Sequence, residues 1–321
     1  MDHMGKGSSS KTVKRDLSVA YGFVDPPDPW PSTGSGDLAV VVPLAVAALT
    51  EDERLSLDRL RRNASGIPRY LVVPDGLELK FDHADFSVVR VPAIAMAGIA
   101  AYNRMMITPW FYRLFAGYRY ILLYQLDCLL LGNSVGRWCE RDWSYVGAPW
   151  FGNRGPDDLK SVGNGGFSLR RIDHMLAVLG SDRFAPQFRF AQQRRHFSGW
   201  KHLKVLANGL IRAWCNGGGS LASRFAASFE RPEDEFWSQY APFFMAGYSL
   251  PTPREALGFA FEDRPRIAFD LTAGRLPLGC HAWSRMDRHF WLERLADLEQ
   301  PARTTGAAGE IDACEREPAL S

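Results

Sequence analysis

The chain has 321 residues, of which 46% are hydrophobic and 23% are charged, and its formal net charge is +2 at pH 7. These values are typical of a soluble globular protein with a sizeable core, and the small net charge gives no indication of a general nucleic-acid binder. No stretch approaches 18 consecutive apolar residues, so we expect no membrane-spanning helix.

The two ends of the chain differ in composition from its middle. Residues 1–36 are rich in Gly, Ser, Pro and charge and lack the apolar core of a signal peptide, so we predict a flexible leader there. Residues 301–321 have a similar composition and are predicted to form a flexible tail, which leaves one domain over 37–300. The cysteines are odd in number and form no CxxC pair, which argues against a disulfide framework or a structural zinc site and favours the cytoplasm. They are Cys128, Cys139, Cys215, Cys280 and Cys314.

Apolar strands alternate with amphipathic helices in the first part of the domain. Thr50 and Glu53 form a capping box at the start of one helix, and Pro109 is expected to break another. Because buried strands that alternate with helices form parallel sheets covered on both faces, we predict an α/β fold with a mostly parallel sheet flanked by helices. The strands are predicted at 38–45, 69–74, 86–91 and 118–127, and the helices at 50–62 and 99–117.

The stretch "YILLYQLDCLLLG" (120–132) places Gln125 and Asp127 in an otherwise apolar run. Ligands of such sheets bind at the carboxyl ends of the strands, which is where Asp127 is expected to lie. A carboxylate at this position can bind a cation, act as a general base or form an ion pair. It can also simply cap the following turn.

Two later stretches also contain candidate binding or catalytic residues. In "SVGNGGFSLRR" (161–171) three glycines surround Asn164, which indicates either a loop whose amides contact a ligand or an ordinary tight turn. In "RPEDEFWSQYAPFF" (231–244) three consecutive acids are Glu233, Asp234 and Glu235. They can supply negative charge at a helix N-terminus or a general base.

His281 lies in the apolar and aromatic stretch "LPLGCHAWSRMDRHFW" (276–291). A single histidine in such surroundings is either a structural residue or a ligand. Together with Asp127 and another acid, it could complete the centre of a metal-dependent transferase.

In their order along the chain, six phrases resemble the GT-A class of nucleotide-sugar-dependent glycosyltransferases, and in particular a bacterial and eukaryotic family of GT-A-like domains. The phrases are "YNRM" (102–105), "YILLYQLD" (120–127), "YVGAPW" (145–150), "VGNGGFSLR" (162–170), "PEDEFW" (232–237) and "GCHAW" (279–283). The resemblance covers residues 38 to 292. It implies a GT-A-like, Rossmann-like fold and a hexosyltransferase of polysaccharide biosynthesis. Such an enzyme transfers a sugar from a nucleotide-sugar donor to a hydroxyl of a glycan or lipid-linked acceptor, with inversion.

The resemblance also implies a cation site. GT-A enzymes typically hold a divalent cation with an Asp-x-Asp motif and a C-terminal histidine, so Asp127 would be the second aspartate and His281 the histidine. Gln125 stands where the first aspartate usually does, and it supplies no charge. The implied cofactor is Mn²⁺ or Mg²⁺, although a metal-independent variant stays open.

By the same resemblance, Asp234 would deprotonate the acceptor hydroxyl, with Glu233 and Glu235 as the alternatives. Trp237 and Trp150 would either stack on a sugar or pack in the core. The other residues implied for the donor and the acceptor are Pro43, Gln125, Asp127, Asn164, Gly165, Gly166 and Phe167.

A basic helical stretch interrupts the domain at about 185–230. On a helix, Trp200, Leu203, Ala207, Leu210 and Trp214 would share an apolar face beside a stripe of basic residues. The face is expected either to pack on its own domain, which we favour, or to bring residues 197–214 to the inner face of a membrane.

Two other functions remain. The glutamine at position 125 suggests a catalytically degenerate domain that binds a sugar nucleotide or a glycan. The sequence is less consistent with a nucleotidyltransferase. Such enzymes carry a Gly- and Arg-rich, Lys-terminated loop after the first strand, and "VVVPLAVAAL" (40–49) lacks this loop.

Overall fold

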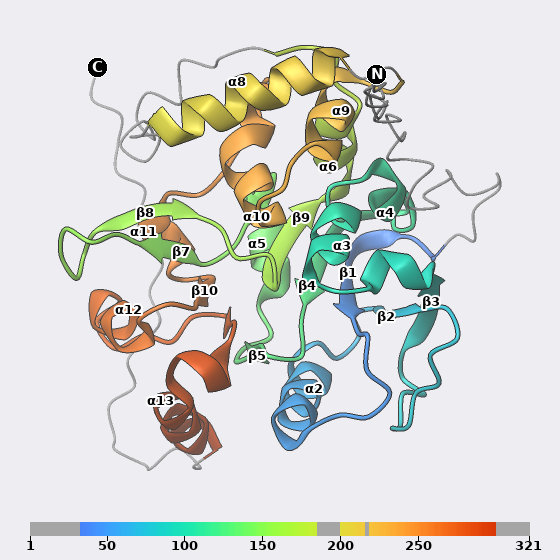
Figure 1. Cartoon of the computed structure of the whole chain (residues 1–321). Helices are drawn as coiled ribbons and strands as arrows, with labels where there is room; N and C mark the ends of the chain where they lie inside the picture. The colour runs from blue at the N-terminus through green and yellow to red at the C-terminus, as the bar shows by residue number, and fades with distance from the viewer. Residues whose placement is uncertain (1–32, 185–199, 216–217, 300–321) are drawn as a thin grey trace, which may run out of the picture.

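A six-stranded central sheet organises the protein in a computed structural model that describes residues 33–184, 200–215 and 218–299 (Figure 1). The strand order is β3-β2-β1-β4-β9-β6, in which β3, β2, β1 and β4 run parallel and β9 is antiparallel to both β4 and β6. The predicted α/β fold with a mixed, mostly parallel sheet is therefore confirmed. The strands are β1 (Gly36–Pro43), β2 (Arg69–Pro74), β3 (Ser87–Val91), β4 (Tyr118–Tyr124), β6 (Tyr145–Val146) and β9 (Phe167–Arg171).

Both faces of the sheet are buried, as the continuous apolar runs of its strands predict. Successive side chains of β1 point to opposite faces, so that Ala39 and Val41 belong to one core cluster while Val40 and Val42 belong to another. The second cluster includes Leu57 of α2 (Glu51–Asn63), and the helix begins with the predicted capping box of Thr50 and Glu53.

Two predicted elements differ in extent from the structure. The helix predicted over 99–117 is divided at the expected break into α3 (Ile99–Met105) and α4 (Pro109–Arg113), because Pro109 starts a new helix that Thr108 caps, and α4 ends before residue 117. The strand predicted over 118–127 ends at Tyr124, the last residue that pairs with β9, so Asp127 lies in the turn that follows.

Two smaller sheets lie beside the central one. A three-stranded sheet has the order β10-β11-β5, and β7 pairs with β8 in a hairpin. Their bounds are β5 (Leu129–Leu130), β7 (Pro149–Phe151), β8 (Leu159–Val162), β10 (Ala260–Phe261) and β11 (Gly279–Cys280). Most of these strands have only two or three residues, which is too short for a periodic pattern to show in the sequence.

The remaining helices surround these sheets (Figure 1). They are η1 (Ala93–Met96), α5 (Val135–Cys139), α6 (Ile172–Leu179), α8 (Trp200–Cys215), α9 (Leu221–Ala227), α10 (Glu233–Glu235), η2 (Phe236–Tyr240), η3 (Ala241–Phe243), α11 (Pro253–Ala256), α12 (Pro265–Leu271) and α13 (Trp283–Glu299).

Helix α8 confirms the predicted basic helix, but its packed face is rotated from the one we expected. Leu206 and Leu210 pack on the core, Ala213 is buried, and Gly209 lies against Phe225 of α9. Ala207 is instead exposed, and the side chain of Trp214 is 82% exposed. The predicted face was chosen to include Trp214. The close approach of α9 instead requires the small residues Gly209 and Ala213 on the packed face.

Several predictions lie outside the described residues or stay untested. The flexible leader and tail fall mostly on 1–32 and 300–321, which lie outside the description. Among the helices described, none has the length and apolarity needed to cross a membrane. Membrane contact through 197–214 stays a prediction.

Candidate active site

Gln125 and Asp127 lie in a tight turn at the carboxyl end of β4. The amide of Gln125 donates to the carbonyl of Gly166 at 2.8 Å, and the amide of Cys128 closes the turn on the carbonyl of Gln125 at 3.0 Å. The carbonyl of Asp127 accepts a hydrogen bond from the amide of Trp283 at 3.1 Å. The turn is therefore fixed to two segments that are distant in sequence.

The small three-stranded sheet brings His281 to this turn. Strand β11 pairs antiparallel with β5, where Cys280 faces Leu129, and parallel with β10, where Cys280 faces Phe261. His281, the residue directly after β11, consequently lies between Asp127 and Glu262, and its amide donates to the carbonyl of Phe261 at 3.0 Å.

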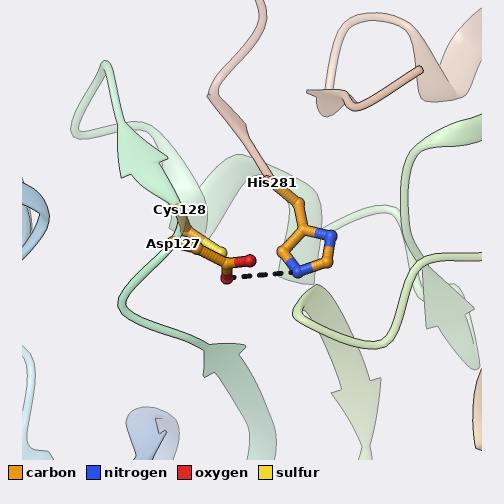
Figure 2. A group of neighbouring side chains, drawn as sticks. All are labelled: Asp127, Cys128 and His281. Atoms are coloured by element: carbon orange, nitrogen blue, oxygen red, sulfur yellow. Dashed lines mark ion pairs between the residues drawn. The ribbon is translucent and has the colours of Figure 1, made fainter. Parts of the chain in front are cut away.

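The imidazole of His281 contacts three side chains with its two nitrogens. Its Nε2 lies 3.2 Å from Oδ1 of Asp127 (Figure 2) and 3.2 Å from Oε1 of Gln125. Its Nδ1 lies 2.9 Å from Oε1 of Glu262. Asp127 and His281 therefore lie together at one site.

These contacts shift the pKa values of both partners. Burial alone would lower the pKa of His281, but hydrogen bonds to Asp127 and Glu262 raise it to about 9. Burial would likewise raise the pKa of Asp127, but His281, together with the positive charge of Arg285, lowers it. The site is thus an imidazole held between two carboxylates.

The donor atoms at this turn fit a divalent cation. Asp127, Cys128 and His281 each offer one ligand atom within 4.8 Å of the others (Figure 2). The Cys128 thiol donates to the carbonyl of Gly166 at 3.2 Å, and burial raises its pKa well above the usual range, so it stays a thiol. A carboxylate, an imidazole and the amide oxygen of Gln125 remain, and this oxygen and nitrogen set suits Mn²⁺ or Mg²⁺.

The spacing of the donor atoms agrees with this chemistry. Two ligands about 2.1 Å from one ion and at right angles are about 3 Å apart, close to the 3.2 Å between Oδ1 of Asp127 and Nε2 of His281. A carboxylate at the other ring nitrogen is the usual partner of a metal-binding histidine, because it keeps the proton on that nitrogen, so that Nε2 is the nitrogen that a cation can bind in exchange for its proton. Glu262 has this position, and its side chain is 15% exposed.

Gly166 leaves the space that this arrangement needs. A Cβ atom at this position would lie 2.2 Å from Nε2 of His281 and 2.6 Å from Oε1 of Gln125. The backbone of residues 163–166, the glycine loop, therefore forms one wall of the candidate cation site.

Replacement of Gly166 by alanine is expected to weaken Mn²⁺ binding about 10- to 100-fold, because the methyl group displaces two candidate ligands. It should also lower the free energy of unfolding by about 1–3 kcal/mol through overpacking. Mn²⁺ titration followed by electron paramagnetic resonance and urea unfolding measure the two effects. Gly136→Ala is the matched control, since a Cβ there meets no atom within 4 Å. Unchanged Mn²⁺ affinity in Gly166→Ala would contradict the assignment.

The glycine loop also contacts the acidic segment, residues 233–235. The backbone amide of Asn164, which has a φ of 69°, donates to Oδ2 of Asp234 at 2.8 Å. The side-chain amide of Asn164 is buried, and neither of its polar atoms has a hydrogen-bond partner among the described residues. Burial raises the pKa of Asp234, and the charge of Glu262 adds to this shift. Asp234 is thus linked to the same loop that forms a wall of the cation site.

Glu233 has a different environment from Asp234. Its carboxylate forms a buried ion pair with Arg170 at 2.6 Å, and Arg170 also donates to Tyr112 and Ser168. Burial raises the pKa of Glu233 to about 7, although Arg170 opposes the shift. Gly165 is required here, because a Cβ at this position would lie 1.9 Å from Oε1 of Glu233. The carboxylate of Glu233 is therefore buried in the core and paired with Arg170, away from solvent.

Glu235 is partly exposed and forms an ion pair with Arg231 at 2.7 Å. Asp234 and Glu235 are therefore the two acids of the segment that are not fully buried.

Three other predicted binding residues belong to the core or to a strand of the central sheet. Trp237 and Phe167 are fully buried; the indole of Trp237 donates to the carbonyl of Met106, and Phe167 packs on Tyr124. Stacking on a sugar needs an exposed ring face, which neither has, so both are core residues. Pro43 ends β1 at the carboxyl edge of the sheet, where it pairs with β2.

The sequence did not single out Glu262 and Arg285, which both act on this site. Glu262 follows the two-residue strand β10, and Arg285 lies exposed in the first turns of α13, where its charge reaches Asp127. The signal for Glu262 is an acid directly after the apolar run "LGFAF", but only the strand pairing reveals its partner.

Comparison with solved structures finds glycosyltransferases at low similarity. The apo form of the glycosyltransferase GlyE of Streptococcus pneumoniae TIGR4 is 14% identical with a TM-score of 0.38, over 80% of this chain and 60% of that one. The apo bifunctional glycosyltransferase WbbM is 10% identical with a TM-score of 0.36, over 76% of this chain and 45% of that one. The mannosyltransferase PcManGT of Pyrobaculum calidifontis, in complex with GDP-Man and Mn²⁺, is 15% identical with a TM-score of 0.30, over 88% of this chain and 87% of that one. The chain thus spans less than two thirds of GlyE and of WbbM.

Among curated proteins no sequence matches this chain. A family model matches residues 85–281, which is more than half of the chain and includes Gln125, Asp127, Asp234, Glu262 and His281. The chain therefore belongs to the family described as "Protein of unknown function (DUF5672)".

Proposed function

We propose that this protein is a GT-A-like glycosyltransferase that transfers a sugar from a nucleotide-sugar donor to a hydroxyl of a glycan or lipid-linked acceptor. The observation that carries the proposal is the 3.2 Å contact between Asp127 and His281, which are 154 positions apart in the sequence and meet at the carboxyl end of β4. These are the two positions that the motif resemblance implies for a cation. The carboxyl end of a strand is also where ligands of such sheets bind.

The cation site would bind the diphosphate of the donor. A divalent cation held by Asp127, His281 and Gln125 would offset the negative charge that the diphosphate gains as the bond to the sugar breaks. Glu262 orients His281 for this role. Arg285 is exposed beside Asp127, where its charge can bind the same diphosphate.

Asp234 would act as the base of an inverting transfer. Its carboxylate accepts the proton of the acceptor hydroxyl while the hydroxyl oxygen attacks the anomeric carbon and the nucleoside diphosphate leaves from the opposite face. The backbone amide of Asn164 holds this carboxylate in place. Glu235 is the alternative base, but it already pairs with Arg231.

A domain that binds a sugar nucleotide without turnover is the second candidate. Gln125 favours it, because the neutral amide lowers the negative charge available for a cation. Release of nucleotide from UDP-, GDP- and dTDP-sugars in the presence of Mn²⁺ separates the two candidates. Turnover of at least one donor supports the transferase, saturable donor binding without turnover supports the second candidate, and neither turnover nor binding contradicts both.

Replacement of Asp234 by asparagine is expected to lower transfer to an acceptor by about 100- to 10,000-fold, the usual contribution of a general base. Because burial raises the pKa of Asp234 and the carboxylate is the reactive form, transfer should rise with pH through a range above that of an exposed aspartate. Initial rates from pH 4 to 8 measure both effects. In Asp234→Asn this acid limb should disappear while nucleotide binding stays unchanged.

Glu235→Gln is the matched control for this prediction, and we expect it to lower transfer less than Asp234→Asn does. The opposite order would assign the base to Glu235.

A further inference from the structure

A cavity of about 850 Å³ opens between the β7–β8 hairpin and residues 231–254. Trp150 and Lys160 lie on its hairpin wall, Glu235 on the opposite wall, and Arg254 comes from the first turn of α11. Its volume is within the range of small-molecule sites, about 300–1,000 Å³. The residues predicted to hold the cation and the donor lie outside its lining, so the cavity is a separate compartment.

The glycine loop connects this cavity to the cation site. At one end of the loop, Gly163 makes room for the indole of Trp150, since a Cβ there would lie 1.9 Å from Cζ2 of the ring. At the other end, Gly166 touches His281 and Gln125. The loop residue between them, Asn164, binds Asp234, whose neighbour Glu235 lines the cavity. The proposed base therefore lies between the two compartments.

The lining of the cavity combines an aromatic ring with an excess of cations. Four of the lining residues are basic and three are acidic. Arg231 is paired with Glu235, whereas the side chains of Arg154, Lys160 and Arg254 form no ion pair within the described part of the chain. A planar indole offers an apolar surface to the C–H face of a sugar, and arginine binds phosphate and carboxylate through paired hydrogen bonds.

We propose that this cavity binds the acceptor, and that the acceptor is a saccharide that carries a phosphate or carboxylate group. The sugar ring packs on Trp150, and the anionic group binds Arg254 together with Arg154 or Lys160. The role of acceptor rests on the proposed transferase function, whereas the binding of an anionic saccharide does not.

Binding of single sugars to the full chain tests this proposal without a donor. Glucose 6-phosphate, glucuronic acid and glucose are titrated separately and followed by saturation-transfer NMR. We expect at least one of the two anionic sugars to bind at least about tenfold more tightly than glucose, and the difference between the two identifies the preferred group. Equal binding of all three sugars, or no binding of either anionic sugar at 10 mM, overturns the proposal.

Arg254→Glu tests the position of the site. Arg254 is exposed in the first turn of α11, where an acidic residue is compatible with the helix, so the variant should fold. We expect it to weaken binding of the preferred anionic sugar at least about tenfold, whereas Arg137→Glu, at an exposed position of α5 outside the cavity, leaves it unchanged. Equal affinity in wild type and Arg254→Glu overturns the assignment to this cavity.

The Asp127→Asn variant separates the two proposals. It should bind the anionic sugar as the wild type does, because Asp127 does not line the cavity. In the wild-type protein, sugar binding without turnover of any nucleotide-sugar would refute the transferase function and leave the saccharide site in place. In the wild-type protein, donor turnover without anionic-sugar binding would refute only the anionic-saccharide site.

Discussion

Replacement of Asp127 by asparagine is expected to lower metal-dependent nucleotide release from the donor by about 100- to 1,000-fold, the size of effect seen when one preorganised electrostatic contact is removed. Asparagine keeps the volume and one oxygen of the side chain but removes its charge. The candidate cation site would then retain only the amide of Gln125 and the imidazole of His281, whose other ring nitrogen lies beside the carboxylate of Glu262. Initial rates at several Mn²⁺ concentrations measure the loss.

Asp270→Asn is the control for this experiment, because Asp270 is exposed on α12 and forms no ion pair among the described residues. It should leave both the rate and the Mn²⁺ dependence unchanged. Circular dichroism and urea unfolding establish that the Asp127 variant is folded. A rate within threefold of the wild type in folded Asp127→Asn would remove the assigned role of this carboxylate.

Replacement of Arg170 by methionine is expected to lower the free energy of unfolding by about 3–5 kcal/mol, the cost of leaving one member of a buried ion pair without its partner. The side chains of Arg170 and Glu233 are 0% and 3% exposed, and their N–O distance is 2.6 Å. Without the guanidinium, Glu233 must either keep an unpaired charge in the core or take up a proton. Urea unfolding at pH 7 measures the difference.

Arg171→Met, one residue further along β9, is the control for this replacement. Its side chain pairs with Asp142 and Asp173, both of which are largely exposed, so we expect a loss of at most about 1 kcal/mol. In the double variant Arg170→Met and Glu233→Leu, both charges are absent and most of the stability should return. A double variant as unstable as Arg170→Met alone would show that the ion pair is not the cause.

The central sheet could be predicted because its strands are long, apolar and separated by helices. The alternation of Ala39 and Val41 with Val40 and Val42 between the two core clusters follows directly from the sequence pattern. The small β10-β11-β5 sheet could not be predicted, since each of its strands has only two residues. This sheet nevertheless places His281 and Glu262 beside Asp127.

The candidate site was accessible from the sequence only in part. Asp127 stands out as a charge at the end of an apolar strand, and His281 was associated with it through the motif resemblance. Glu262 is marked in the sequence only as an acid after a short apolar run, because its relation to His281 arises from strand pairing between distant segments. For Trp237 the sequence left open whether the ring stacks on a sugar or packs in the core, and the structure encloses its indole between Tyr112 and Phe236.

The most direct test of the cation site is calorimetric titration with UDP, GDP and dTDP, each with and without Mn²⁺. We expect at least one nucleoside diphosphate to bind the wild-type chain in the presence of Mn²⁺ at least about tenfold more tightly than in its absence. We also expect Asp127→Asn to lose this enhancement. Equal affinity with and without Mn²⁺, or an enhancement that survives in Asp127→Asn, would contradict the claim that Asp127 and His281 together hold the cation that binds the diphosphate.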